Sequence, residues 1–200
     1  MNNTGFIILA AGESSRLGKI KQLLSFNRKT LLQHVIDEAS NAGAKPIVVI
    51  TGANAAKISA SIASGKVSIL YNENWKDGMA SGIVAGVRHV LSLNGTIKKI
   101  IISVCDQPFV SAALFGQLDQ RQTISGKGIV ACAYADTIGT PALFTLKYFD
   151  QLMALKGDEG AKKILKSNKE DVDTVNFSKG EVDIDTQSDY ENLLKEQELS

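Results

Sequence analysis

Residues Leu9 to Leu24 combine small residues, glycines and cations in a pattern that suits phosphate binding. The stretch follows an apolar run and holds two glycines, Gly12 and Gly18, and three cations. Small residues let a ligand touch the backbone, where free amides can hold phosphate oxygens. Arg16 and Lys21 add the positive charge that a polyphosphate needs. The pattern therefore indicates a nucleoside triphosphate site, and the alternative that composition leaves open is a basic surface loop.

Two familiar phosphate-binding motifs are excluded by spacing. A P-loop has four residues between its glycines, followed by Lys and then Ser or Thr. Here five residues separate Gly12 from Gly18, and Lys19 is followed by Ile20. The dinucleotide fingerprint G-x-G-x-x-G is absent as well, because alanines precede Gly12.

A carboxylate, Asp106, comes just after the apolar segment 100–104, so a rigid strand would present it at the edge of a sheet. Magnesium binds carboxylate oxygens and keeps waters and phosphates as its other ligands. The structural alternative is that Asp106 caps the next helix, but Ser111 is better placed for that role. Its position makes Asp106 a good candidate for a single metal ligand.

A second carboxylate should converge on the same ion from elsewhere in the chain. Asp183 lies in an expected edge strand, 182–184, and Asp185 directly follows it, so the two carboxylates, two residues apart in an extended segment, should point to one face. Asp189 is expected to open the final helix, 188–194, where negative charge is favourable.

The elements that must position these residues alternate between strands and helices. The predicted strands are 6–9, 46–51, 67–71, 99–104 and 128–133, and the predicted helices are 31–42, 55–63, 81–93 and 111–121. This alternation favours an α/β fold with a doubly wound, mostly parallel sheet and helices on both faces. Ligands bind such sheets at the carboxyl ends of the strands, where Gly12 and Asp106 fall.

The alternation stops after Pro141. A short strand, 142–145, precedes helical segments 146–155 and 161–167, and 172–175 and 182–184 are predicted as small edge strands of an antiparallel extension. The sequence shows no linker, repeat or low-complexity segment, so we expect residues 1–200 to form one domain. About residues 1–110 are expected to be its nucleotide-binding half, and about 111–200 its acceptor-binding half.

The bulk properties narrow the class of protein. The hydrophobic fraction of 44% and charged fraction of 22% are typical of a globular domain that can bury a core. A net charge of +1 gives no reason to expect nucleic acid or a membrane as partner. Two cysteines, Cys105 and Cys132, and the absence of a signal-like or membrane-spanning segment favour a cytoplasmic protein.

Six blocks, in order along the chain, resemble those of the MobA-like nucleotidyltransferases, most of all the molybdenum cofactor cytidylyltransferase branch. The blocks are L-A-A-G-E-S-S-R-L-G-K-I-K-Q-L-L at 9–24, N-E-N-W-K-D-G-M-A-S at 72–81, C-D-Q-P at 105–108, G-T-P at 139–141, G-D-E-G-A at 157–161 and D-I-D-T-Q-S-D-Y at 183–190. The resemblance covers nearly the whole chain and implies a Rossmann-like nucleotidyltransferase fold.

The resemblance also implies roles for individual residues. Arg16, Lys21 and Asp106 would be catalytic, and Asp106 and Asp185 would be the magnesium ligands. The residues expected to bind the nucleotide are Leu9, Ala10, Ala11, Gly12, Gly78 and Ser81, although Ser81 could equally be a plain helix cap.

Some positions depart from the family pattern. Gly82 stands where cytidylyltransferases often have a second serine, and Thr140 where they often have His or Asn. Lys162 replaces a frequent Arg, which keeps the charge but not the bidentate geometry. These differences affect acceptor identity and base choice more than reaction type.

The expected activity is magnesium-dependent transfer of a nucleoside monophosphate from a triphosphate to a phosphorylated acceptor, with release of pyrophosphate. The resemblance implies CTP rather than GTP, molybdopterin as acceptor, and a molybdoenzyme or chaperone as partner. The alternatives are a guanylyltransferase on molybdenum cofactor and a cytidylyltransferase on a sugar or polyol phosphate. A nucleotide-binding sensor or cofactor chaperone without turnover is the alternative from another class.

Overall fold

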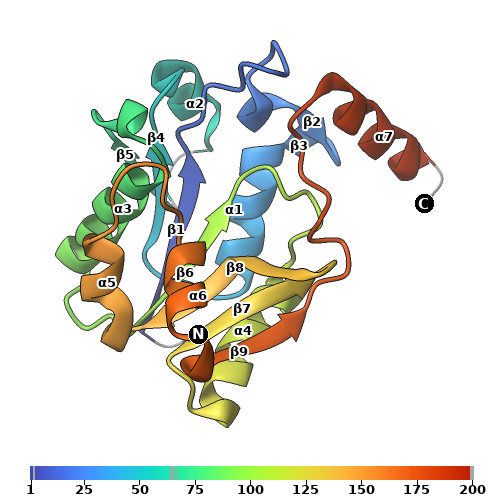
Figure 1. The fold of residues 1–200 in the computed structure, drawn as a ribbon. Coiled ribbons are helices and arrows are strands. Elements are labelled where there is room, and N and C mark those ends of the chain that lie inside the picture. The colour runs from blue at the N-terminus through green and yellow to red at the C-terminus, as the bar shows by residue number, and fades with distance from the viewer. Residues whose placement is uncertain (2, 64, 66, 199–200) are drawn as a thin grey trace.

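The computed structural model describes residues 1, 3–63, 65 and 67–198, which are built around a seven-stranded sheet (Figure 1). Across the sheet the strands are β5 (Ser68–Tyr71), β4 (Ile47–Thr51), β1 (Thr4–Ala10), β6 (Lys99–Val104), β8 (Thr137–Thr145), β7 (Ile129–Tyr134) and β9 (Val172–Asn176). A second, two-stranded sheet pairs β2 (Ser25–Phe26) with β3 (Lys29–Thr30). The predicted fold class, a mostly parallel sheet with a small antiparallel addition, is confirmed.

Strand pairing brings the predicted site residues to one edge of the large sheet. β1 pairs in parallel with both β4 and β6, and its Leu9 is level with Ile50 on one side and Val104 on the other. Parallel neighbours end at the same edge, so the loop after β1 and the loop after β6 emerge side by side. β8 runs antiparallel to β6 and β7, whereas β9 is parallel to β7.

Helices cover both faces of the large sheet. The α-helices are α1 (Leu31–Asn41), α2 (Ala55–Ser61), α3 (Met79–Leu93), α4 (Ala112–Ser125), α5 (Phe149–Met153), α6 (Lys162–Ser167) and α7 (Gln187–Glu198). Four 3-10 turns are η1 (Lys21–Leu23), η2 (Trp75–Asp77), η3 (Leu146–Tyr148) and η4 (Lys169–Asp171) within the described chain.

Successive side chains of β1 point to opposite faces of the sheet, so the apolar core is divided into two clusters, one on each face. Phe6 and Ile8 pack with residues of α1 and α4, and Phe6 meets Phe115 edge to face at 4.7 Å. Ile7, between them, packs with Val87 of α3 on the other side. Burying a large apolar side chain stabilises the fold by roughly 1.5–3 kcal/mol. The strands that end in the site are therefore rigid supports.

The last helix, α7, lies beside the small sheet rather than on the large one (Figure 1). Leu193 of α7 and Ile184 pack with Phe26 and Leu31, and the Tyr190 hydroxyl donates to the Ser25 carbonyl at 3.0 Å. The segment before α7 is thereby anchored near the loop that follows β1.

The predicted edge strand 182–184 is wrong. Its backbone makes separate contacts instead of a ladder: the Ile184 amide donates to the Asp106 carbonyl, and the Asp185 and Thr186 amides donate to the Asp189 carboxylate. The predicted helix 146–155 is also shorter than expected, because it divides into η3 and α5. The predicted strand 142–145 extends backwards to Thr137, where it forms a hairpin with β7.

Within the described residues, no helix combines the length and the apolar character that crossing a membrane requires.

Candidate active site

A cleft of about 700 Å³ lies at the carboxyl edge of the large sheet, over the ends of β1 and β6. It is lined by most of the residues expected there, namely Leu9, Ala10, Ala11, Gly12, Lys21, Gly78 and Asp106. Other residues of its wall, which were not predicted as site residues, include Gln22, Asn72 and Asp158. We call this hollow the main cleft.

The loop after β1 is held in shape by Gln22, which sequence reasoning missed. Its side chain is fully buried, and Nε2 donates to the carbonyls of Ala10 and Gly12, each at 3.0 Å. The Ser14 hydroxyl accepts from the Lys21 amide at 3.2 Å, which ties the far end of the loop to its middle. A glutamine among apolar residues, directly after Lys21, was the available signal.

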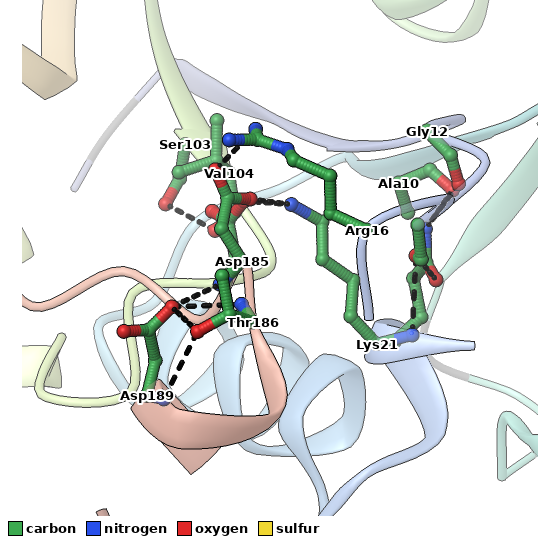
Figure 2. A network of polar contacts seen from close by, with 12 residues as sticks. Ala10, Gly12, Arg16, Lys21, Ser103, Val104, Asp185, Thr186 and Asp189 are labelled. Carbon is green, nitrogen blue, oxygen red and sulfur yellow. Dashed lines mark hydrogen bonds and ion pairs between the residues drawn. The ribbon is translucent and has the colours of Figure 1, made fainter. Parts of the chain in front are cut away.

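Arg16, Lys21, Asp106 and Asp185 form one ion-pair network, although they come from three separate parts of the chain. Lys21 Nζ lies 2.5 Å from Asp106 Oδ2 and 3.0 Å from Asp185 Oδ1. Arg16 Nη2 lies 2.6 Å from the other oxygen of Asp185, and Figure 2 shows both cations converging on this carboxylate. The structure thus brings together the four charged residues for which catalytic or metal-binding roles were predicted.

The environment of this network strengthens its charges. The Lys21 and Asp106 side chains are only 15% and 16% exposed. Burial opposes a charged Lys21, but attraction to Asp106 and hydrogen bonds to Asp106 and Asp185 outweigh it and raise the pKa of Lys21 above its usual value. Lys21 therefore stays protonated at any physiological pH. By contrast, the Arg16 side chain is 73% exposed, although it pairs with Asp185.

Asp185 is positioned by the start of α7. The Asp189 carboxylate accepts hydrogen bonds from the amides of Asp185 and Thr186 and from the Thr186 hydroxyl, as Figure 2 shows. These bonds, above all the one from the Thr186 side chain, lower the pKa of Asp189. The Thr186 hydroxyl accepts in return from the Asp189 amide at 3.2 Å, so Thr186 caps the helix.

Asp183 does not share a face with Asp185 on a strand, as expected, because the segment is irregular. It lies at an exposed position in the wall of a second hollow. Partial burial, together with repulsion from Asp106 and Asp185, raises the pKa of Asp183. Asp106 and Asp185 are therefore close enough to Asp183 to repel its negative charge.

The 72–81 segment forms the opposite wall of the main cleft. Asn72 Nδ2 donates to Ser81 Oγ, and Ser81 Oγ donates to the Gly78 carbonyl, each at 2.8 Å. Ser81 lines a neighbouring hollow and not the main cleft, whereas Asn72 lines both. Ser81 therefore supports the wall of the main cleft through its hydrogen bonds to Asn72 and Gly78. Its predicted contact with nucleotide stays a prediction.

Gly78 itself is required by its surroundings. Its φ of +95° is unfavourable for other residues, and a Cβ there would come within 2.5 Å of the Gly157 carbonyl oxygen. Trp75 anchors the same wall by packing closely on Gly52. A Cβ added to Gly52 would lie only 2.5 Å from the Trp75 Cβ, so there is no room for a larger residue there. The wall and the 157–158 loop are therefore packed directly against one another.

A second hollow of about 380 Å³, which we call the side pocket, adjoins the main cleft. The two share Lys21, Met79, Val104 and Asp106 in their walls. The remainder of the side pocket comes from the later part of the chain, namely Gln107, Tyr134, Thr140, Gly180, Glu181, Asp183 and Asp185. One molecule in each hollow would therefore meet at the ion-pair network.

The donor set suits a magnesium ion with few protein ligands. Asp106 and Asp185 converge on a single cationic group, the Lys21 ammonium, so their oxygens already face a common point. No group of three or more His, Cys, Asp or Glu side chains in the described part of the chain could hold a metal. Magnesium bound to one or two carboxylates completes its shell with water and substrate phosphates, which fits this arrangement.

The two histidines and the two cysteines lie in structural surroundings. His34 Nε2 is 3.1 Å from the Val110 carbonyl oxygen, and His89 Nε2 is 2.7 Å from the Ser68 hydroxyl. Cys105 and Cys132 are buried free thiols, and burial raises the pKa of Cys132 to about 12. Neither cysteine is placed to act as a nucleophile.

The family model that describes the MobA-like NTP transferase domain matches residues 6–172. The chain belongs to the MobA-like NTP transferase family. The match runs from β1 to the first residue of β9, and so includes β4, β5, β6 and the loops of the main cleft. The resemblance to this family, drawn from the sequence motifs, is confirmed.

Several relatives place this MobA-like domain among known proteins. It is 31% identical over 126 residues to a probable molybdenum cofactor guanylyltransferase of Opitutus terrae, and 31% identical over 113 residues to nicotine blue oxidoreductase of Paenarthrobacter nicotinovorans. These matches cover 62% and 56% of this chain but only 57% and 53% of those relatives. The chain thus spans little more than half the length of each.

A solved structure matches over nearly its whole length. Rv0371c of Mycobacterium tuberculosis superposes with a TM-score of 0.84 and 29% identity, covering 96% of this chain and 97% of that one. The same protein has also been solved in complex with manganese, with a TM-score of 0.79 and 27% identity.

Proposed function

We propose that this MobA-like domain transfers a nucleoside monophosphate from a magnesium-bound triphosphate to a phosphorylated small molecule and releases pyrophosphate. The observation that carries the proposal is the network of Arg16, Lys21, Asp106 and Asp185 at the junction of two hollows. The main cleft is the proposed nucleotide site and the side pocket the proposed acceptor site. Residues 1–110 supply most of the former, although Asp158 reaches it from the second half.

The proposed mechanism is in-line attack of an acceptor phosphate oxygen on the α-phosphorus of the nucleotide. Lys21, buried and permanently charged, stabilises the charge that develops on the α-phosphate. Arg16, which is exposed, neutralises the departing pyrophosphate. The backbone of Ala10 to Gly12 lies against the phosphates because its side chains are small, and Gln22 fixes its shape.

Asp106 and Asp185 are the proposed magnesium ligands. A bound ion would supply Lewis-acid stabilisation of phosphate charge. The manganese complex of Rv0371c supports a divalent ion in a related protein. Asp106 is fixed by β6 and Asp185 by the cap of α7, so both carboxylates are oriented in advance of substrate.

The proposed nucleotide is CTP. The motif at 9–24 supports this choice, because it resembles most of all the cytidylyltransferase branch of the family. GTP is the second candidate, because the relative from Opitutus terrae is named a guanylyltransferase.

The proposed acceptor is a molybdopterin-type phosphate, in line with the same relative's name, and the product would pass to a molybdoenzyme or its chaperone. A sugar or polyol phosphate is the alternative within the enzyme class. A sensor without turnover is less compatible with the site, because a binding protein has no need for two cations that are paired with two converging carboxylates.

Pyrophosphate release tests the proposal. The purified protein is given CTP or GTP in turn with magnesium and molybdopterin, and kcat/KM is compared for each nucleotide. We expect turnover with CTP to exceed turnover with GTP by about tenfold or more. Preference for GTP would favour the guanylyltransferase alternative, and nucleotide binding without pyrophosphate release would favour the sensor. Asp150→Asn, an exposed carboxylate on α5, serves as the matched control for charge removal.

A further inference from the structure

A carboxylate from the second half of the chain lies in the wall of the main cleft without a protein partner. Asp158 is exposed and lines the main cleft, and within the described part of the chain its side chain has no hydrogen bond or ion pair. The neighbouring Glu159 differs, because its carboxylate pairs with Lys163 at 2.5 Å and does not line the cleft. An ionised carboxylate only accepts hydrogen bonds, so Asp158 is available to donors of a bound ligand.

The backbone around Asp158 is fixed against the wall formed by the 72–81 segment. The loop 154–161, between α5 and α6, lies beside the start of α3 (Figure 1). There the Ala80 amide donates to the Gly157 carbonyl at 3.1 Å. A Cβ built on Gly78 would lie only 2.4 Å from Asp158 Oδ1, so this carboxylate packs directly on the Gly78 backbone. Asp158 therefore has a defined place in the wall.

This contact places Asp158 near the reacting end of the nucleotide. Met79, next to Gly78, lines both the main cleft and the side pocket, so it marks the border at which the α-phosphate is proposed to react. The loop reaches Met79 too, because a Cβ on Gly160 would lie 3.0 Å from its sulfur. In a nucleoside triphosphate the ribose is bonded directly to the α-phosphate, and the base lies beyond it. The ribose is therefore the part of the substrate that we expect beside Asp158.

The negative charge of Asp158 restricts which groups of the substrate it can contact. A carboxylate repels phosphates, which the proposed function places beside Lys21, so its partner must be a neutral hydrogen-bond donor. The ribose offers two adjacent hydroxyl groups, and the two oxygens of one carboxylate can accept from both. Dinucleotide-binding folds use an acidic side chain for a ribose hydroxyl in the same way.

We propose that Asp158 selects ribonucleotides by accepting hydrogen bonds from the 2′- and 3′-hydroxyl groups of the ribose. The inference rests on the proposed function, which puts the nucleotide in the main cleft. It assigns a nucleotide contact to the half of the chain that was expected to bind the acceptor. It does not depend on the base, because CTP and GTP carry the same ribose.

Nucleotide affinity tests this inference without turnover. The full chain is titrated in magnesium with CTP, 2′-deoxy-CTP, 3′-deoxy-CTP and UTP, and GTP is compared with 2′-deoxy-GTP in the same way. We expect each deoxynucleotide to bind about tenfold more weakly than its parent, as the loss of a hydrogen bond to a charged group implies. The ratio should be similar for the cytidine and guanosine nucleotides.

Variants at two neighbouring carboxylates then assign the preference. Asp158→Asn and Asp158→Ala should each reduce the ratio of CTP to 2′-deoxy-CTP affinity to about threefold or less. A variant that only loosened the wall would weaken both ligands equally and keep the ratio. Glu159→Gln is the matched control and should keep the wild-type ratio.

The outcomes separate this inference from the proposed function. Equal affinity for CTP and its deoxy analogues, or a ratio that the Asp158 variants do not alter, would overturn the ribose contact even if pyrophosphate were released. A changed ratio of CTP to UTP affinity, with the deoxy ratio unaltered, would assign Asp158 to the base and overturn it as well. A ribose preference that depends on Asp158, without pyrophosphate release, would support the ribose contact and contradict the nucleotidyl transfer. Failure to bind any of the nucleotides would contradict both.

Discussion

The two segments that meet at the site are held by different means. The loop after β1, which carries Arg16 and Lys21, is braced from within, because Gln22 bonds to the carbonyls of Ala10 and Gly12. The segment before α7, which carries Asp185, is braced from outside, by the Asp189 carboxylate and the backbone of Asp106. The cations are therefore preorganised by their own loop, whereas Asp185 depends on how α7 docks.

This difference predicts which changes affect chemistry and which affect assembly of the site. A substitution among the charged groups should abolish turnover without unfolding the protein. A substitution of Gln22, which we call the internal brace, should impair both stability and nucleotide binding. A substitution of Asp189, which we call the external brace, should mainly reduce kcat.

The largest effect is expected from Asp106→Asn. Loss of the carboxylate at the end of β6 removes a proposed magnesium ligand and leaves Lys21 with one partner, so kcat/KM should fall by about 10³-fold or more. Pyrophosphate release measures the loss, and thermal unfolding should remain cooperative. Turnover within about tenfold of wild type would show that Asp106 is not part of the catalytic centre.

Lys21→Met should reduce kcat by about 10²–10³-fold, because the cation acts on charge that develops during the reaction. Nucleotide affinity, measured by titration, should change less than kcat. Lys19→Met is the matched control, since Lys19 lies on the same loop and has no role in the network. A variant with normal kcat and weakened affinity alone would assign Lys21 to binding instead.

Gln22→Leu tests the internal brace. It leaves the carbonyls of Ala10 and Gly12 without their donor, so we expect about 1–3 kcal/mol less stability and roughly tenfold weaker CTP binding. Denaturant unfolding and nucleotide titration measure the two effects. If both stayed at wild-type values, the loop would not depend on this side chain.

Asp189→Asn tests the external brace and should have the smallest effect. Weakening the cap should cost about 1 kcal/mol of stability and lower kcat severalfold, while CTP affinity stays near wild type. Gln187→Ala, in the same turn, is the control. An equal loss of CTP affinity would contradict the separation between the two braces.

The same carboxylate gives this segment a pH dependence. Because hydrogen bonds lower the folded-state pKa of Asp189, its contribution to stability is present above the unfolded value of about 3.9. That contribution is lost as pH falls through the lower, folded value. Unfolding of wild type and Asp189→Asn should therefore converge at low pH, and a constant difference across the acid range would exclude this linkage.

The sequence predicted the strand-end parts of the site better than the parts that depend on tertiary contacts. The position of Asp106 followed from an apolar strand that ends just before it, and local pattern was sufficient. Gln22 was missed because burial of a polar side chain cannot be read from local periodicity. The expected strand at 182–184 was wrong because the Ile184 amide bonds to the Asp106 carbonyl, which only the folded chain brings near.

The side pocket also depends on tertiary contacts that local sequence pattern does not reveal. Gln107 was part of a recognised motif, but the orientation of its amide depends on Gly180, 73 residues further along the chain. Asp183 and Asp185 were expected on one face of a strand, yet only Asp185 joins the ion-pair network, because the backbone there is irregular.

A double-mutant cycle on Asp106 and Asp185 tests the central claim most directly. If the two carboxylates act as one unit around a shared ion, Asp106→Asn, Asp185→Asn and the double variant should all lose kcat/KM to similar extents, within about tenfold. Losses that instead multiply in the double variant would show that the two aspartates act independently and would contradict the account.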